Sequence, residues 1–276
     1  MLNPKSRLAR AINIIYDGVV LKDYDNVLCI IGDEGKGKSN ILLQIVDFWL
    51  KKRYNTITPE MANRFIAMDS KDLGRVIKGV TNFDILANDE AADLSSRSSM
   101  SKINKTYVKA YSIIRGKNLF TILVLPDLFD LDTFFRKRRV RNLIYTNKRG
   151  VIHFWGKQRL KKLVEINEVS KTKNYFCVQP LFSDRVPLYK GVLSDPYKKM
   201  KEEKISKIQD ELYNELMSGS TNEAMNKETE TMIKLKEGND WSYGTLAKYY
   251  NISGDAIRKR IKAYTGAKNE NEEAII

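Results

Sequence analysis

The chain has 276 residues, 42% of them hydrophobic and 10% aromatic, so it can bury a sizeable core and is not expected to be a disordered tail. Lysine and arginine number 48 against 34 aspartates and glutamates, and the net charge of +14 favours a polyanion over an acidic protein surface as the partner. Two cysteines and one histidine argue against a disulfide framework and multi-histidine zinc chemistry, and without a signal peptide or a long apolar run the chain is expected to be soluble and cytoplasmic, with no membrane span.

The first informative element is the glycine-rich segment 32–39, which directly follows an apolar stretch at 27–31. It matches G-x-x-x-x-G-K-[ST], the pattern in which backbone N–H groups and the start of the next helix hold phosphate groups. Lys38 is expected to reach the β and γ phosphates of ATP, and Ser39 to offer its hydroxyl to Mg²⁺. A glycine-rich turn that matches by chance is the alternative. The residues predicted to bind the nucleotide are Gly32, Gly35, Lys36, Gly37, Lys38, Ser39, Asn40 and, further along the chain, Asp127.

Strand-like apolar runs recur along the first half of the chain, with helical patterns between several of them. They lie at 27–31, 65–68, 83–87, 119–125, 143–145 and 151–155. This alternation predicts an α/β fold with a mostly parallel sheet flanked by helices.

The apolar run 83–87 leads into Asn88, Asp89 and Glu90, an arrangement that looks like a Walker B motif. Asp89 is expected to hold the magnesium shell, directly or through water, and Glu90 to orient the water that attacks the γ phosphate. Two acids after a strand also occur at ordinary helix N-termini, where carboxylates complement the helix dipole. The phosphate loop upstream favours the catalytic interpretation.

The next strand, 119–125, ends at Pro126 and Asp127, where a polar side chain would face the nucleotide crevice, so Asp127 is a candidate sensor. Beyond it, residues 133–162 include eleven lysines and arginines and no acidic residue. This basic belt would supply an arginine to a neighbouring subunit's nucleotide or follow the phosphates of DNA, and the two uses are compatible. The candidate catalytic arginines are Arg136, Arg138, Arg139 and Arg141.

From Pro196 onward, apolar residues at three- to five-residue intervals in a charged stretch predict a helix with one apolar stripe. The small polar residues 218–222 then have the composition of a flexible connector. The predicted segments are an ATPase domain at 1–196, a charged helix and linker at 197–222, a helix-turn-helix domain at 223–268 and an acidic tail at 269–276.

Residues 241–262 resemble a helix-turn-helix. Asn251 can take the left-handed conformation of the turn, Ser253 can cap the second helix, and Ile252, Ile257 and Ile261 are expected to pack it. A small helical packing or oligomerisation module is the alternative. The residues predicted to contact DNA are Arg258, Lys259, Arg260 and Lys262.

The order of these parts resembles that of P-loop ATPases of the HerA/FtsK type, which include viral packaging ATPases and zonula-occludens-toxin-like phage proteins. The resemblance covers roughly residues 20–195 and concerns motif order. It rests on the segments 32–39, 89–90, 119–125, 131–136 and 194–197. It implies an additional-strand, RecA-like ATPase that uses ATP and Mg²⁺, assembles as a hexameric ring and moves or remodels DNA. Family members commonly place glutamine after the sensor strand, where this chain has Pro126 and Asp127.

The leading hypothesis is therefore a DNA-stimulated ATPase, a motor or remodeller of a virus, plasmid or other mobile element. DNA packaging, transfer and replication-associated handling all fit. An ATP-dependent DNA-binding switch with slow hydrolysis remains open. A small-molecule kinase is disfavoured by the basic belt and the C-terminal motif.

Overall fold

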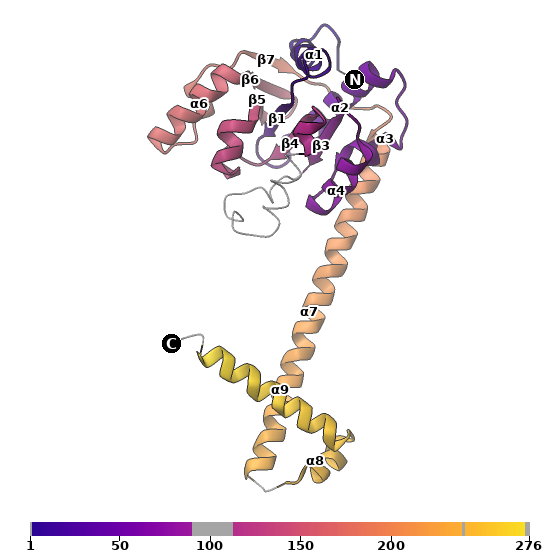
Figure 1. Ribbon diagram of the computed structural model, residues 1–276, viewed down its shortest axis with the longest axis vertical. Helices are drawn as coiled ribbons and strands as arrows, with labels where there is room; N and C mark the ends of the chain where they lie inside the picture. The colour runs from indigo at the N-terminus through magenta and orange to yellow at the C-terminus, as the bar shows by residue number, and fades with distance from the viewer. Residues whose placement is uncertain (1, 90–112, 239–240, 274–276) are drawn as a thin grey trace. The chain divides into compact units, whose positions relative to one another are not determined.

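The computed structural model describes residues 2–89, 113–238 and 241–273, and the chain divides into two compact units, residues 1–204 and 205–276. Within the described residues, the first unit is built on a seven-stranded sheet (Figure 1). The strands are β1 (Asn26–Ile31), β2 (Ile66–Ala67), β3 (Ile85–Asp89), β4 (Phe120–Leu125), β5 (Val140–Lys148), β6 (Val151–Trp155) and β7 (Phe182–Arg185).

The strand order is β2-β3-β4-β1-β5-β6-β7. The first five strands in this order are parallel, whereas β6 and β7 extend the sheet in antiparallel fashion. β1, β3 and β4 are almost wholly buried, as parallel strands covered on both faces should be, and this explains their uninterrupted apolar runs. The expected α/β fold with a mostly parallel sheet is confirmed.

Helices flank this sheet. Those of the first unit are α1 (Arg7–Val20), α2 (Lys38–Tyr54), α3 (Met61–Phe65), α4 (Ser70–Gly79) and α6 (Lys157–Ser170). α2 packs over β1, β3 and β4, whereas α6 packs against β5 and β6. Trp49 of α2 is fully buried, with its ring centroid 4.6 Å from that of Phe120 in β4 and 4.8 Å from that of Tyr16 in α1. Cys29 lies fully buried in β1, and burial raises the pKa of its thiol.

The expected strands differ from the observed ones by one or two residues at the ends of β1 to β4, and by more at two places. β5 is longer than the expected run 143–145, because Arg141 and Lys148 interrupt its apolar pattern in the sequence. β7 was not expected, since it is a short strand at the edge of the sheet whose residues are only partly buried and carry polar side chains.

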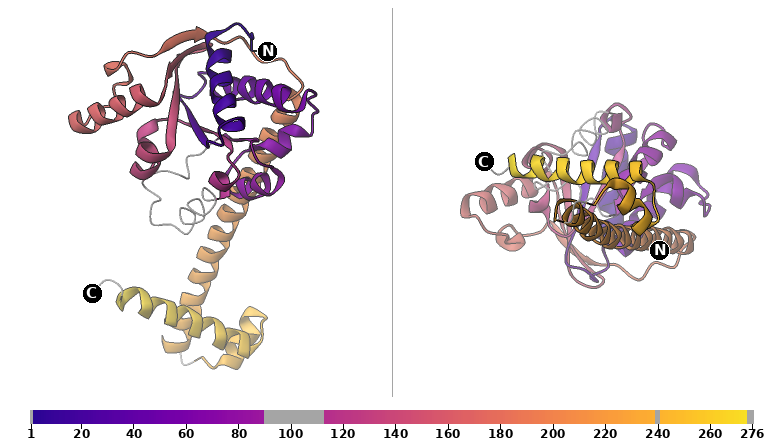
Figure 2. Two further views of the ribbon diagram at one scale, coloured as in Figure 1. Left: turned by 45° about the horizontal axis from the view of Figure 1, so that its top comes forward. Right: turned by 90° about the horizontal axis from the view of Figure 1, so that it is seen from below.

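Helix α7 (Ser194–Gly238) belongs to the first unit up to Lys204 and to the second unit from Ile205 onward. Its start lies beside α3 and α4 (Figure 1 and Figure 2), where the Lys204 ammonium donates to the carbonyl of Met68. Residues 218–222, expected to form a connector, lie within this helix, and the units divide at 204/205.

The second unit packs the last turns of α7 against α8 (Tyr243–Tyr250) and α9 (Gly254–Glu273). Met232, Leu246 and Ile257 form its buried centre. Asn251 has φ +52° in the turn that ends α8, and the Ser253 hydroxyl caps α9 by accepting from the Ala256 amide, as expected. Ile252 is exposed instead of packing the second helix. No helix in the described part of the chain is long and apolar enough to cross a bilayer.

Candidate nucleotide-binding site

The loop between β1 and α2 depends on glycine at two positions. Gly32 has φ +143°, and a Cβ there would collide with the backbone carbonyl of Thr146 in β5. Gly37 has φ +89° and is the left-handed residue from which α2 starts. The backbone is therefore bent in a way that other residues rarely adopt, with the helix N-terminus directly after the bend. Such a loop can present successive N–H groups to a phosphate.

Lys38 is the first residue of α2, and its ammonium folds back over the loop. It donates to the carbonyl of Gly32 at 2.5 Å and to that of Asp33 at 3.0 Å. Burial lowers the pKa of Lys38, while Asp89, Glu34 and Asp33 act in the opposite direction. The charged form of Lys38 is therefore costlier than that of an exposed lysine, and an anion entering the loop would stabilise that charged form.

Ser39, in the first turn of α2, lies beside Asp89 at the end of β3, although β4 lies between β1 and β3 in the sheet. The Ser39 hydroxyl donates to Asp89 Oδ2 at 3.0 Å and lies 3.3 Å from Oδ1. A hydroxyl and a carboxylate are oxygen ligands of the kind that Mg²⁺ prefers. The two side chains that the sequence analysis assigns to the metal therefore form a donor set that fits it, whereas Glu90 lies outside the described residues.

Tyr197 is a member of this site that the sequence analysis did not assign. It sits in the first turn of α7 and donates its hydroxyl to Asp89 Oδ2. Its side chain is buried, and it lies 108 positions from Asp89 in the chain, so no local spacing could have indicated the contact. Lys201, one turn further along α7, is close enough to Lys38 to lower its pKa. The start of α7 thus forms one wall of the site.

Asn40 and Asp127, both predicted to bind the nucleotide, are engaged by other parts of the chain. Asn40 donates to the Pro187 carbonyl at 3.0 Å and accepts from the Tyr189 amide at 2.6 Å, which ties α2 to the segment before α7. Asp127 lies at the correct sheet edge, next to Pro126, whose carbonyl accepts from the Gly32 amide. Its carboxylate accepts from the Tyr175 hydroxyl at 2.6 Å and pairs with Lys173 at 3.0 Å.

Three of the four candidate catalytic arginines are held by acids of the same chain. Arg136 is 9% exposed and pairs with Glu168 at 2.9 Å. Arg139 and Arg141 lie 3.4 Å and 3.9 Å from Asp25. Arg138 is exposed and forms no ion pair with a residue in the described ranges.

These arginines also lie at the far end of the sheet from the phosphate loop of their own chain. Val140, which lies between Arg139 and Arg141, pairs with Val27 near the start of β1, whereas Tyr145 pairs with Ile31 at its end. The turn between β5 and β6 lies at the same end of the sheet as the phosphate loop. Arg149 in this turn comes close to the loop, since a Cβ added to Gly37 would lie 3.9 Å from the Arg149 Cγ. Arg149 is thus the basic-belt residue placed to meet an anion in the same chain's loop.

No family model, curated protein or solved structure matched the chain. The geometry of the site consists of a bent glycine loop at the start of α2, with Lys38 and Arg149 beside it. The Ser39 hydroxyl donates to the Asp89 carboxylate next to this loop.

The four residues predicted to contact DNA in the second unit differ in their surroundings. Lys259 and Lys262 are exposed. Arg258 is exposed with its guanidinium 5.2 Å from the centre of the Tyr243 ring. Arg260 is mostly buried and pairs with Glu228 of α7 at 2.6 Å, so it holds the helices of this unit together.

Proposed function

We propose that the chain is a P-loop ATPase that binds ATP with Mg²⁺ and acts on DNA. The observation that carries the proposal is the Ser39–Asp89 contact beside a lysine-bearing glycine loop, because it unites two separately predicted motifs in one place. The position of β4 between β1 and β3 supports the additional-strand architecture that the resemblance implies. A hexameric ring is the assembly expected from the same resemblance.

In this proposal each residue has a distinct task. The loop amides and Lys38 bind the phosphates, Ser39 and Asp89 hold the metal shell, and Glu90 orients the attacking water. Bound Mg²⁺ supplies charge neutralisation of the phosphate oxygens. Arg149 is placed to neutralise charge from the same subunit, whereas Arg138 is free to do so for a neighbouring one.

The first test separates binding from turnover. Lys38→Ala should abolish nucleotide binding or hydrolysis, because it removes a phosphate contact, whereas Glu90→Gln should retain ATP binding and block turnover. Binding is measured with a fluorescent ATP analogue and turnover by phosphate release. Glu237→Gln, which changes an exposed carboxylate in the second unit, is the control. Normal hydrolysis by the Glu90 variant would show that the Walker B assignment is wrong.

A DNA-binding switch with slow hydrolysis is the second candidate. It uses the same site, and the contact of Tyr197 with Asp89 fits it as well, because α7 contributes residues to both units. ATPase rates measured without DNA and with duplexes of increasing length distinguish the two. A motor should be stimulated, and more so by longer DNA; a switch should show a slow rate that does not depend on length.

A further inference from the structure

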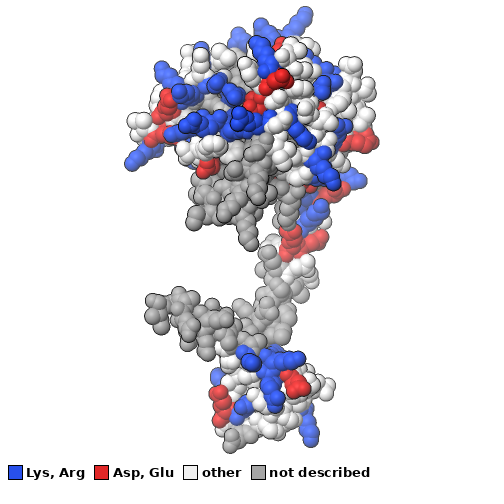
Figure 3. Space-filling view, viewed as in Figure 1, with Lys and Arg blue, Asp and Glu red and all other residues white. Residues whose placement is uncertain are grey.

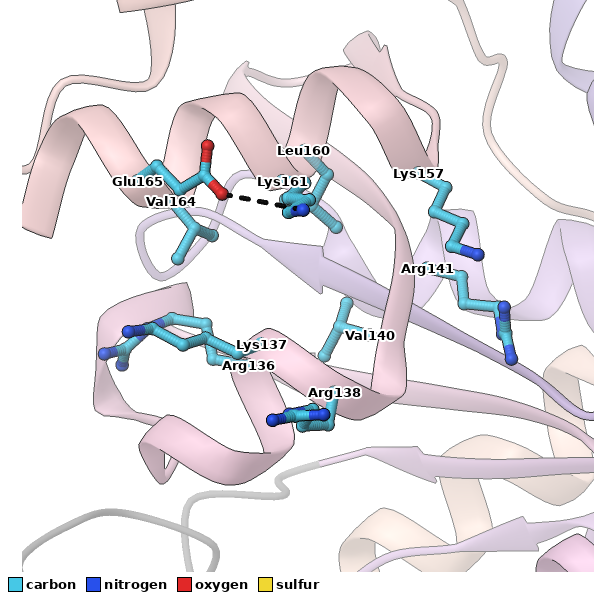
Figure 4. A pocket seen from close by; sticks show the side chains of 10 residues that line it. All are labelled: Arg136, Lys137, Arg138, Val140, Arg141, Lys157, Leu160, Lys161, Val164 and Glu165. Carbon is cyan, nitrogen blue, oxygen red and sulfur yellow. Dashed lines mark ion pairs between the residues drawn. The ribbon is translucent and has the colours of Figure 1, made fainter.

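A pocket of about 510 Å³ opens between the π-helix η4 (Phe135–Arg139), the start of β5 and α6 (Figure 4). Three apolar side chains, Val140, Leu160 and Val164, are buried at its base. Its basic side chains come from both sides, and they are Arg136, Lys137, Arg138, Arg141, Lys157 and Lys161. Among the described residues, Glu165 is the acidic side chain that lines it.

This pocket is not part of the nucleotide site of the same chain. Val140, one of the residues that line it, pairs with Val27 near the start of β1. The phosphate loop follows Ile31, at the other end of that strand. A ligand here would therefore leave the loop free.

The positive charge of the pocket exceeds what nearby acids neutralise. Glu168 pairs with Lys137 at 2.6 Å as well as with Arg136, and the Glu165–Lys161 pair is long, at 3.8 Å, and exposed. Asp25 is shared between Arg139 and Arg141. Arg138 and Lys157 are exposed and have no ion-pair partner in the part of the chain that the structure describes. Lysine and arginine side chains gather on the side of the first unit that carries α6 (Figure 3).

We propose that this pocket binds the phosphodiester backbone of a nucleic acid, a step that rests on the proposed action on DNA. No aromatic ring of the described residues lines it, so these residues offer no platform for base stacking, and their donors suit phosphates. Its basic side chains are spread across it, with Arg136 and Lys137 at one side and Arg141 and Lys157 at the other (Figure 4), which favours a chain of phosphates over a single anion. Binding at this site is therefore independent of base sequence.

The experiment uses the full chain with Lys157→Gln and Lys161→Gln, in a background where Lys259→Gln and Lys262→Gln weaken the second unit's contribution. Affinity for a duplex of about 30 base pairs is measured over a series of salt concentrations without nucleotide. The pocket pair should weaken binding about tenfold and make the slope of log affinity against log salt shallower by about two, since each phosphate contact contributes about 0.9. Lys157→Arg with Lys161→Arg should retain both values.

The matched control is Lys22→Gln with Lys78→Gln, two exposed lysines outside the pocket, which remove the same charge. Equal affinity and slope in the pocket and control pairs would overturn the proposal, as would absence of DNA binding by the parent chain. The proposal would also be overturned if inorganic phosphate, or polyglutamate of matched charge, displaced the bound duplex as well as competing duplex does. The pocket would then bind a free anion or an acidic protein. Absence of DNA binding by the parent chain would also overturn the proposed action on DNA, whereas equal values in the pocket and control pairs would not. None of these outcomes alters the Lys38 and Glu90 test, so the proposed ATP hydrolysis stands or fails separately.

Discussion

The polar groups that a nucleotide would need are already bonded within the protein. Lys38 donates to two loop carbonyls, and Asp89 accepts from both Ser39 and Tyr197. Binding would therefore exchange one set of hydrogen bonds for another, and the net gain per bond is smaller than the bond itself. We expect the affinity for nucleotide to depend strongly on the strength of these internal hydrogen bonds.

Tyr197→Phe tests this directly, because it removes one donor and leaves the ring. The Asp89 carboxylate would lose a buried partner, so the nucleotide-free protein should be less stable by about 1–3 kcal/mol. Addition of ATP with Mg²⁺ should then raise the melting temperature by more than in the wild type, since the ligand restores what the variant lost. Differential scanning fluorimetry measures both values.

Tyr24→Phe is the control, because Tyr24 is 62% exposed. An unchanged melting temperature for Tyr197→Phe would indicate that the hydroxyl does not restrain Asp89. A lower rise with ATP than in the wild type would mean that Tyr197 supports the metal site instead of competing with it.

At the scale of elements, the sequence predicts best what is local. The strand before the loop, the loop itself and the helix after it follow from apolar runs and from backbone conformations that require glycine. The partners of the arginines do not follow, because Asp25 and Glu168 are distant in the chain and only the folded sheet and α6 bring them close. The role of Tyr197 could not be predicted for the same reason, since Asp89 is distant from it in the chain. β7 could not be predicted because an edge strand needs no apolar run.

The two ends of β5 carry arginines with different expected partners. If subunits assemble, Arg138 would act on a neighbour's nucleotide and Arg149 on that of its own subunit. Mixing Lys38→Ala with Arg138→Ala should then restore part of the ATPase activity, because one kind of interface has both residues intact. Mixing Lys38→Ala with Arg149→Ala should restore none, because each subunit's own site is defective.

Phosphate release from mixtures at several ratios provides the measurement, with co-assembly checked by solution mass. Lack of recovery in the first mixture, in proteins that co-assemble, would argue against action in trans. Recovery in both would place Arg149 at an interface.

For the whole molecule, the second unit is expected to add DNA affinity to the first. Lys259→Gln with Lys262→Gln should weaken binding, and Arg260→Ala should instead lower the unit's thermal stability, because Arg260 pairs with Glu228. Binding titrations and thermal melts of the full chain measure these two effects.

If the lysines contact phosphates, the loss should be the same for all sequences and the salt dependence shallower; if they contact base edges, it should concentrate on one site. Unchanged DNA affinity in the lysine variant would make the unit a packing or assembly module.

The burial of Cys29 gives the protein a chemical reporter of its own. The thiolate is the reactive form of cysteine, and the raised pKa and complete burial of Cys29 suppress it, whereas Cys177 is partly exposed. A thiol reagent should label Cys177 quickly and Cys29 only when the central strand opens. Mass spectrometry over time would thus follow the opening of the sheet, and a slower labelling of Cys29 with ATP and Mg²⁺ would record ligand binding without any mutation or attached dye.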